Sequence, residues 1–245
     1  MLSGSLRGVK LRMNNLVQGS VFLRNYEPDK QQAFLFLIKP GITFFDVGAN
    51  VGLHSYFVTR HFPSVKIVSF EPLPGNADYL RESVKQNNFS NITIVQAAVG
   101  ATAGETYFDE NVTNWQGSIT TQQTNLKVKL ITLDEYTSQN NVYPHVVKVD
   151  VEGAESDVLK GAKELITRHT PSFIIELHNP EQDIEVAAIL LRHGYTVFRL
   201  NPQARKKGDQ VILPIAKLNA SWPDPDGVWG NIIAIHSTRL KDFGL

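Results

Sequence analysis

Short apolar runs that alternate with helical patterns constrain the fold of this chain more than any other feature. Five nearly continuous runs occupy residues 42–47, 66–71, 92–97, 145–150 and 172–177. Runs of this kind are typical of parallel strands that are covered on both faces. Apolar residues at three- and four-residue spacings follow the first, second, fourth and fifth runs, as amphipathic helices require. The sequence therefore predicts an α/β fold with a mostly parallel sheet.

The two ends of the chain extend this core. Apolar runs at 195–200 and 231–236 are expected to complete the sheet, and 156–169 is expected to be one helix. Residues 9–25 resemble short strands, and a helix is expected at 31–41, where Pro40 and Gly41 end it. No repeat or linker is visible, so we expect one domain over residues 1–245.

Composition narrows the classes of function. The chain has 24 Lys and Arg against 24 Asp and Glu, so no global positive field favours nucleic acid as a partner. Because it has no cysteine, disulfides, thiolate metal sites and a cysteine nucleophile are excluded. The N-terminal segment lacks a signal-peptide core, and no apolar run approaches the roughly 18 residues of a membrane span. We expect a cytoplasmic protein.

Carboxylates stand at the ends of four of the apolar runs: Asp46, Glu71, Asp150 and Glu176. A buried, unpaired carboxylate costs several kcal/mol. In open α/β sheets, ligands bind beyond the carboxyl ends of the strands, so we expect these acids to line one ligand site. The alternative is that they accept hydrogen bonds from loop backbones and helix N-termini.

The stretch DVGANVG at residues 46–52 links the first run to its helix. Gly48 permits a turn that a side chain would block, and Gly52 lets the helix pack close to the strand. The spacing departs from the G-x-G-x-x-G pattern of dinucleotide-binding loops, which counts against a nicotinamide cofactor. Glu71 follows Asp46 by 25 residues, about the distance at which an acid meets a ribose diol in nucleotide-binding folds.

Four motifs in order carry a resemblance to a known family: DVGANVG (46–52), FEP (70–72), AAVG (97–100) and KVDVEGAE (148–155), with YEP (26–28) upstream. Together they resemble the FkbM family of S-adenosylmethionine-dependent methyltransferases, over about residues 25–200. The resemblance implies a Rossmann-like class I sheet of seven strands with a final antiparallel strand and helices on both faces. It also implies methyl transfer, usually to a hydroxyl oxygen.

The same resemblance implies site residues. Residues 1–41 would cap the cofactor site of a core spanning 42–245, and Glu27 would close over the cofactor. The remaining contacts would surround its methionine part (Asp46, Gly48, Asn50, Gly52), its ribose (Glu71, Pro72) and its adenine (Gln96, Ala97, Ala98). The acceptor would be a hydroxyl of a glycan or a small metabolite, which the fold does not specify.

Candidate bases lie near the ends of the fourth and fifth runs: Asp150, Glu152, Glu176 and His178. An ordinary histidine pKa of about 6.5 makes His178 the best-tuned single base, although it could instead cap a backbone group. Asp150, Glu176 and His178 could also bind Mg²⁺ or Mn²⁺. Two other functions remain open from the residues alone, a nicotinamide-dependent oxidoreductase and a catalytically silent cofactor-binding module.

Overall fold

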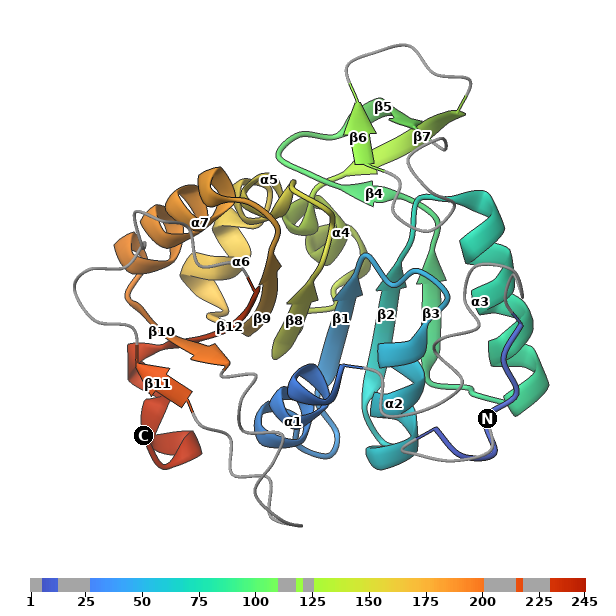
Figure 1. Ribbon diagram of the computed structural model, residues 1–245, viewed down its shortest axis with the longest axis horizontal. Coiled ribbons are helices and arrows are strands. Elements are labelled where there is room, and N and C mark those ends of the chain that lie inside the picture. The colour runs from blue at the N-terminus through green and yellow to red at the C-terminus, as the bar shows by residue number, and fades with distance from the viewer. Residues whose placement is uncertain (1–5, 13–26, 110–117, 121–125, 201–214, 218–229) are drawn as a thin grey trace.

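The computed structural model describes residues 6–12, 27–109, 118–120, 126–200, 215–217 and 230–245. Its large sheet contains eight strands: β1 (Thr43–Val47), β2 (Lys66–Phe70), β3 (Ile92–Val95), β8 (Val146–Val149), β9 (Ser172–Leu177), β10 (Tyr195–Leu200), β11 (Ile215–Lys217) and β12 (Gly230–His236). They lie in the order β11-β10-β12-β9-β8-β1-β2-β3 (Figure 1). Strand β12 runs antiparallel to both of its neighbours. The predicted fold class is confirmed, and β11 is an edge strand that the sequence did not indicate.

The order of the strands reverses between β1 and β8. From β1 the chain moves outward through β2 to β3, then returns to the other side of β1 at β8 and continues to β9. All five strands are parallel. A crevice for a ligand therefore belongs at the carboxyl ends of β1 and β8.

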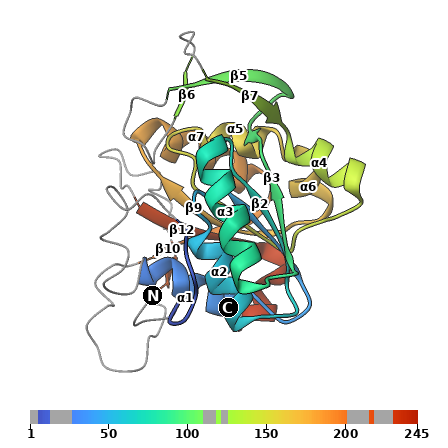
Figure 2. The ribbon, with the colours of Figure 1, turned by 90° about the vertical axis from the view of Figure 1, so that its right-hand side faces the viewer.

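Seven helices among the described residues cover the two faces of the sheet: α1 (Pro28–Leu37), α2 (Leu53–His61), α3 (Pro74–Asn87), α4 (Leu133–Asn140), α5 (Glu155–Lys160), α6 (Lys163–Arg168) and α7 (Pro180–Arg192). Neighbouring strand residues point to opposite faces. Phe44 accordingly packs with Phe34 of α1, whereas Phe45 belongs to a second core with Leu165 of α6. Figure 2 shows α1 on one side of β2 and β3, and α4 and α6 on the other.

The structure changes three expected boundaries. Helix α1 covers Pro28–Leu37 instead of 31–41. Residues 9–12 form no strand, and the rest of the expected strands, 13–25, lies outside the described residues. The helix expected at 156–169 is divided into α5 and α6 at Gly161, where an added Cβ would lie 2.0 Å from the carbonyl oxygen of Gly100.

A small second sheet stands above β1, β2 and β3 in Figure 1. It contains β4 (Ala98–Val99), β5 (Gly104–Asp109), β6 (Ser118–Thr120) and β7 (Leu126–Ile131), in the order β4-β7-β5-β6. The amide of Gly100 donates to the carbonyl of Ile131 at 3.0 Å, and that of Asp134 to Gly161 at 3.0 Å. These main-chain contacts fix the base of the small sheet, which the sequence did not predict.

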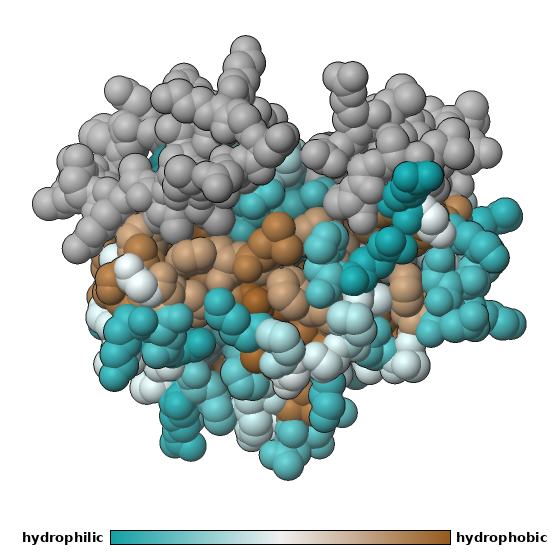
Figure 3. Space-filling view, turned by 90° about the horizontal axis from the view of Figure 1, so that it is seen from below, coloured by the Kyte–Doolittle hydropathy of each residue, from teal (hydrophilic) through white to brown (hydrophobic). Residues whose placement is uncertain are grey.

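The surface carries few large exposed apolar side chains. Among the described residues, Leu35, Ile184, Leu191 and Leu245 are more than one third exposed. Seen from below, apolar residues gather between hydrophilic ones (Figure 3). Every helix in the described part of the chain is too short or too polar to cross a bilayer.

Candidate active site at the carboxyl ends of the strands

Both glycines of the loop after β1 are required by their neighbours. Gly48 has φ 75°, and a Cβ there would lie 1.8 Å from the carbonyl oxygen of Asp150. Gly52 has φ 88°, and its Cβ would lie 2.2 Å from Leu80 Cδ1. The tight packing predicted at Gly52 is therefore against α3 and not against the strand. The loop can approach β8 and α3 only because these two positions lack side chains.

Glu71 directly follows β2 and faces the same loop. Its carboxylate accepts hydrogen bonds from the backbone amides of Asn50 at 2.8 Å and Leu73 at 3.0 Å, and from Asn76 Nδ2 at 3.4 Å. Burial raises the pKa of Glu71 to about 7, although these donors oppose the rise. A carboxylate has about four acceptor positions, so acceptor capacity remains for a further hydroxyl donor.

Asp46 does not lie on the wall of the crevice, where the sequence analysis expected it. It lies inside β1 with 0% of its surface exposed. Its Oδ2 accepts a hydrogen bond from Ser55 of α2 at 2.7 Å, and its Oδ1 lies 3.3 Å from Lys148 Nζ. Asp46 therefore supports the loop from beneath, because an acid in mid-strand points into the helix layer and not out of the strand end.

Lys148 is the cation at the centre of this support. Its side chain is 2% exposed, and its ammonium donates to the carbonyl of Gly48 at 2.7 Å and lies 3.5 Å from Asp150 Oδ2. The charges of Asp150 and Asp46 outweigh the effect of burial and raise the pKa of Lys148. Lys148 thus links the loop after β1, through the carbonyl of Gly48, to the carboxylates of Asp46 and Asp150.

His178, which follows β9, is surrounded by three acids. Its Nδ1 lies 2.8 Å from the buried carboxylate of Glu155, and its Nε2 lies 3.3 Å from Glu152 and 3.6 Å from Asp150. Burial opposes protonation, but these carboxylates outweigh it and raise the pKa of His178 to about 9. The expected ordinary pKa is therefore wrong, and the imidazole is protonated at neutral pH.

Lys30 of α1 reaches into the same cluster. Its Nζ lies 2.7 Å from Glu27 and 2.8 Å from Asp150, and it also contacts Glu176 in β9. Burial raises the pKa of Asp150, but the charges of Lys148 and Lys30 outweigh it and hold that pKa well below its ordinary value. The acids predicted at the ends of β8 and β9 are thus brought together around an amine.

Glu27 joins the cluster from the start of α1. Its carboxylate lies 3.1 Å from His54 Nε2. Burial acts to raise the pKa of Glu27, but His54 and Lys30 outweigh it and lower the pKa. Glu27, Asn50 and Glu152 all adopt positive φ angles, 45°, 51° and 55°. Such backbone costs about 1–3 kcal/mol per residue and gathers at functional sites.

The residues expected at the adenine lie around the connection from β3 to β4. Ala97 and Ala98 are buried. Gln96 is exposed, and its Oε1 accepts a hydrogen bond from Arg81 at 2.9 Å. Pro72 is half-buried beside Glu71. Ala97 and Ala98 pack into the two apolar clusters beside this connection, and their contact with an adenine stays a prediction.

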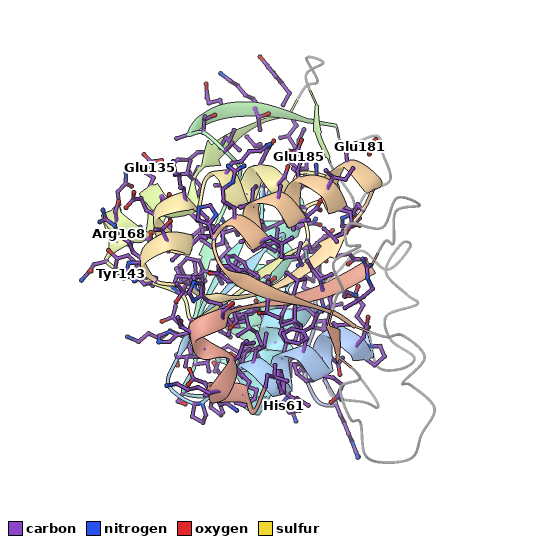
Figure 4. All side chains as sticks on the ribbon, turned by 90° about the vertical axis from the view of Figure 1, so that its left-hand side faces the viewer. His61, Glu135, Tyr143, Arg168, Glu181 and Glu185 are labelled. Carbon is purple, nitrogen blue, oxygen red and sulfur yellow. The ribbon has the colours of Figure 1, made fainter. Side chains whose placement is uncertain are left out.

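A separate hollow of about 320 Å³ lies between α4 and α6. Glu135, Tyr143 and Arg168 line it and lie together along one edge of the molecule in Figure 4. Tyr143 stacks on His169 with ring centroids 4.0 Å apart. Because Tyr143 precedes β8, this hollow lies at the amino ends of the strands, away from the crevice.

Sequence reasoning missed Lys30, His54 and Lys148 as members of the site. Lysine is almost never fully buried unless it is paired, and no pattern in the sequence reveals a partner 120 residues away, as Asp150 is from Lys30. Lys148 gave one signal, its place inside an apolar run between Val147 and Val149.

Comparisons with known proteins identify the family of the chain. The model of the methyltransferase FkbM domain family matches residues 46–197. The chain is 25% identical over 201 residues to "Methyltransferase 1" of Beauveria bassiana, covering 71% of this chain and 80% of that protein. It is 28% identical over 148 residues to "Hexuronic acid methyltransferase AglP" of Haloferax volcanii, covering 59% of each chain.

A third relative and a solved structure extend the comparison. "31-O-demethyl-FK506 methyltransferase FkbM" of Streptomyces tacrolimicus is 23% identical over 195 residues, covering 65% of this chain and 75% of that protein. The crystal structure of Methyltransferase FkbM from Methylobacillus flagellatus superposes with a TM-score of 0.54 at 16% identity. The match covers 84% of this chain and half of that one, so it shows the fold. The chain belongs to the FkbM methyltransferase family.

Proposed function

We propose that the protein transfers a methyl group from S-adenosylmethionine to a hydroxyl of a carbohydrate or another hydroxylated metabolite. The observation that carries this proposal is the placement of Glu71 beside the loop at 48–52, at the end of β2, with β1 between it and the acids at the ends of β8 and β9. The names of the hexuronic acid and FkbM relatives support the acceptor class.

The residues of the crevice fit this cofactor. The remaining acceptor capacity of Glu71 suits the hydroxyls of a ribose. Gly48 and Gly52 let the loop backbone approach β8 and α3, and the adenine would lie at the connection from β3 to β4, beside Ala97 and Ala98. The carboxylates of Asp150 and Glu176 lie at the ends of β8 and β9, on the opposite side of the loop from Glu71, where an acceptor would enter.

The bound cofactor would supply an electrophilic methyl group. The protein then has to hold an acceptor oxygen in line and take its proton. The candidates for this task are the carboxylates of Asp150, Glu152 and Glu176, and the neighbouring His178, whose raised pKa favours its protonated form. A carboxylate is a far weaker base than an alkoxide, so the hydroxyl proton leaves during methyl transfer and not before it.

Calorimetric titration with S-adenosylhomocysteine tests the cofactor assignment. Wild type should bind it, and Glu71→Ala should weaken binding at least about tenfold, because hydrogen bonds to a charged acceptor are lost. Glu82→Ala is the matched control, since Glu82 is an exposed acid that pairs with Arg12. The proposal fails if S-adenosylhomocysteine gives no heat while NAD saturates the protein. If S-adenosylhomocysteine binds, mass spectrometry of glycan acceptors incubated with the protein and S-adenosylmethionine measures the methyl transfer itself.

A further inference from the structure

An amine lies where the sequence suggested a metal ion. Ligand atoms of Asp150, Glu176 and His178 all lie within 4.8 Å of one another, a spacing that suits one cation. Lys30 Nζ is 2.8 Å from Asp150 Oδ2 and contacts Glu176 Oε2. The ammonium group therefore contacts one oxygen of each of the two carboxylates that a metal ion in this place would use.

A divalent ion could bind there only by displacing Lys30. Mg²⁺ and Ca²⁺ bind oxygen ligands at about 2.0–2.6 Å, closer than an ammonium that holds the same oxygens would allow. The side chain of Lys30 is 1% exposed, and Glu27 holds it from a third direction at 2.7 Å. Asp29, its neighbour on α1, accepts a hydrogen bond from Asn231 of β12 at 2.9 Å. The helix that carries Lys30 is thus fixed to the sheet beside the site.

We propose that Lys30 is a positioning residue that fills the cation place between Asp150 and Glu176, so that methyl transfer by this protein needs no divalent metal. Lys30 holds the two carboxylates side by side against their mutual repulsion. It thereby keeps both acids pointing at the place where the acceptor proton is lost. The catalytic part of this inference rests on the function proposed above, whereas the occupation of the cation place does not.

Binding of Mn²⁺, followed by electron paramagnetic resonance without cofactor or acceptor, tests the cation place. Lys30→Met should gain a Mn²⁺ site, and adding Asp150→Asn should abolish it. Wild type, Lys30→Arg and the control Lys66→Met should gain none, since Lys66 is exposed at the start of β2. The inference is overturned if wild type binds Mn²⁺ through Asp150, or if folded Lys30→Met binds none.

Activity supplies the second test. Lys30→Met should lower kcat about a hundredfold, as expected for misplaced catalytic groups, and Mn²⁺ or Mg²⁺ should restore part of it. Wild-type kcat should be unchanged by EDTA. An EDTA-sensitive wild type that Mg²⁺ reactivates would overturn the inference even if Lys30→Met fails to fold. A correct Mn²⁺ pattern without any methyl transfer would instead refute the proposed function alone.

Discussion

Replacing Glu71 with glutamine should change how the stability of the protein depends on pH. In the folded state the pKa of Glu71 is about 7, against an ordinary value of 4.5. Below pH 4.5 the group is protonated in both the folded and the unfolded state. Above pH 7 it is ionised in both, and the folded state then bears the full cost of burying the charge. Between these values the folded state binds more protons, so wild-type stability falls as pH rises.

The magnitude follows from the two pKa values. They differ by 2.5, and one unit of pKa corresponds to about 1.4 kcal/mol, so the buried charge costs about 3 kcal/mol above pH 7. Glutamine cannot ionise. The stability of Glu71→Gln minus that of wild type should therefore rise by about 3 kcal/mol between pH 4.5 and pH 8.

Urea unfolding followed by circular dichroism across this pH range measures the difference. The amide of glutamine cannot accept both backbone hydrogen bonds from Asn50 and Leu73, which adds a constant offset. Only the change with pH therefore counts. Glu82→Gln, at an exposed position, should leave the profile unchanged. Parallel curves for wild type and Glu71→Gln would refute the reasoning, because they would mean that the backbone donors cancel the cost of burial.

Two further substitutions test the support beneath the loop. Lys148→Met should lower the free energy of unfolding by about 3–5 kcal/mol, because it leaves the buried carboxylate of Asp46 without its cation. A loss under about 1 kcal/mol in urea unfolding would contradict this. Gly48→Ala should lower Tm by at least about 10 °C, because its Cβ meets a backbone oxygen at 1.8 Å. Gly75→Ala, with open space around it, should stay close to wild type in the same melting experiment, and equal Tm values for the two variants would show that the loop can relax.

The sequence predicted the large sheet well because its central strands are buried on both faces and read as continuous apolar runs. The small sheet was not predicted because its strands are short or partly exposed. In β7, for example, Lys127 and Lys129 are exposed and only Val128 and Ile131 are buried. Helix α4 was not predicted, because its sequence is mostly polar; in the structure Thr132 caps it by accepting a hydrogen bond from Glu135 N at 3.0 Å. The division at Gly161 depends on contact with Gly100, which no local pattern reveals.

The site shows the same limit. Acids at strand ends could be placed because parallel strands end at one edge. The partners of those acids could not, because Lys30 is brought to Asp150 and Glu176 only by tertiary packing. The raised pKa of His178 likewise follows from three carboxylates of the segment 150–155, which only tertiary packing brings beside the end of β9. Residue types were therefore predictable, but their charges were not.

The meeting of Gly100 with Gly161 has a consequence for how this protein can diverge. Main-chain groups at Gly100, Ile131, Asp134 and Gly161 join the small sheet to the core, and the side chains of Val99, Ile131 and Leu133 pack into the core at the same place. Main-chain bonds do not depend on the side chains they carry, apart from the requirement for glycine at 161. Any residue larger than glycine at position 161 would therefore push the end of α5 away from Gly100 and tilt the small sheet against the core.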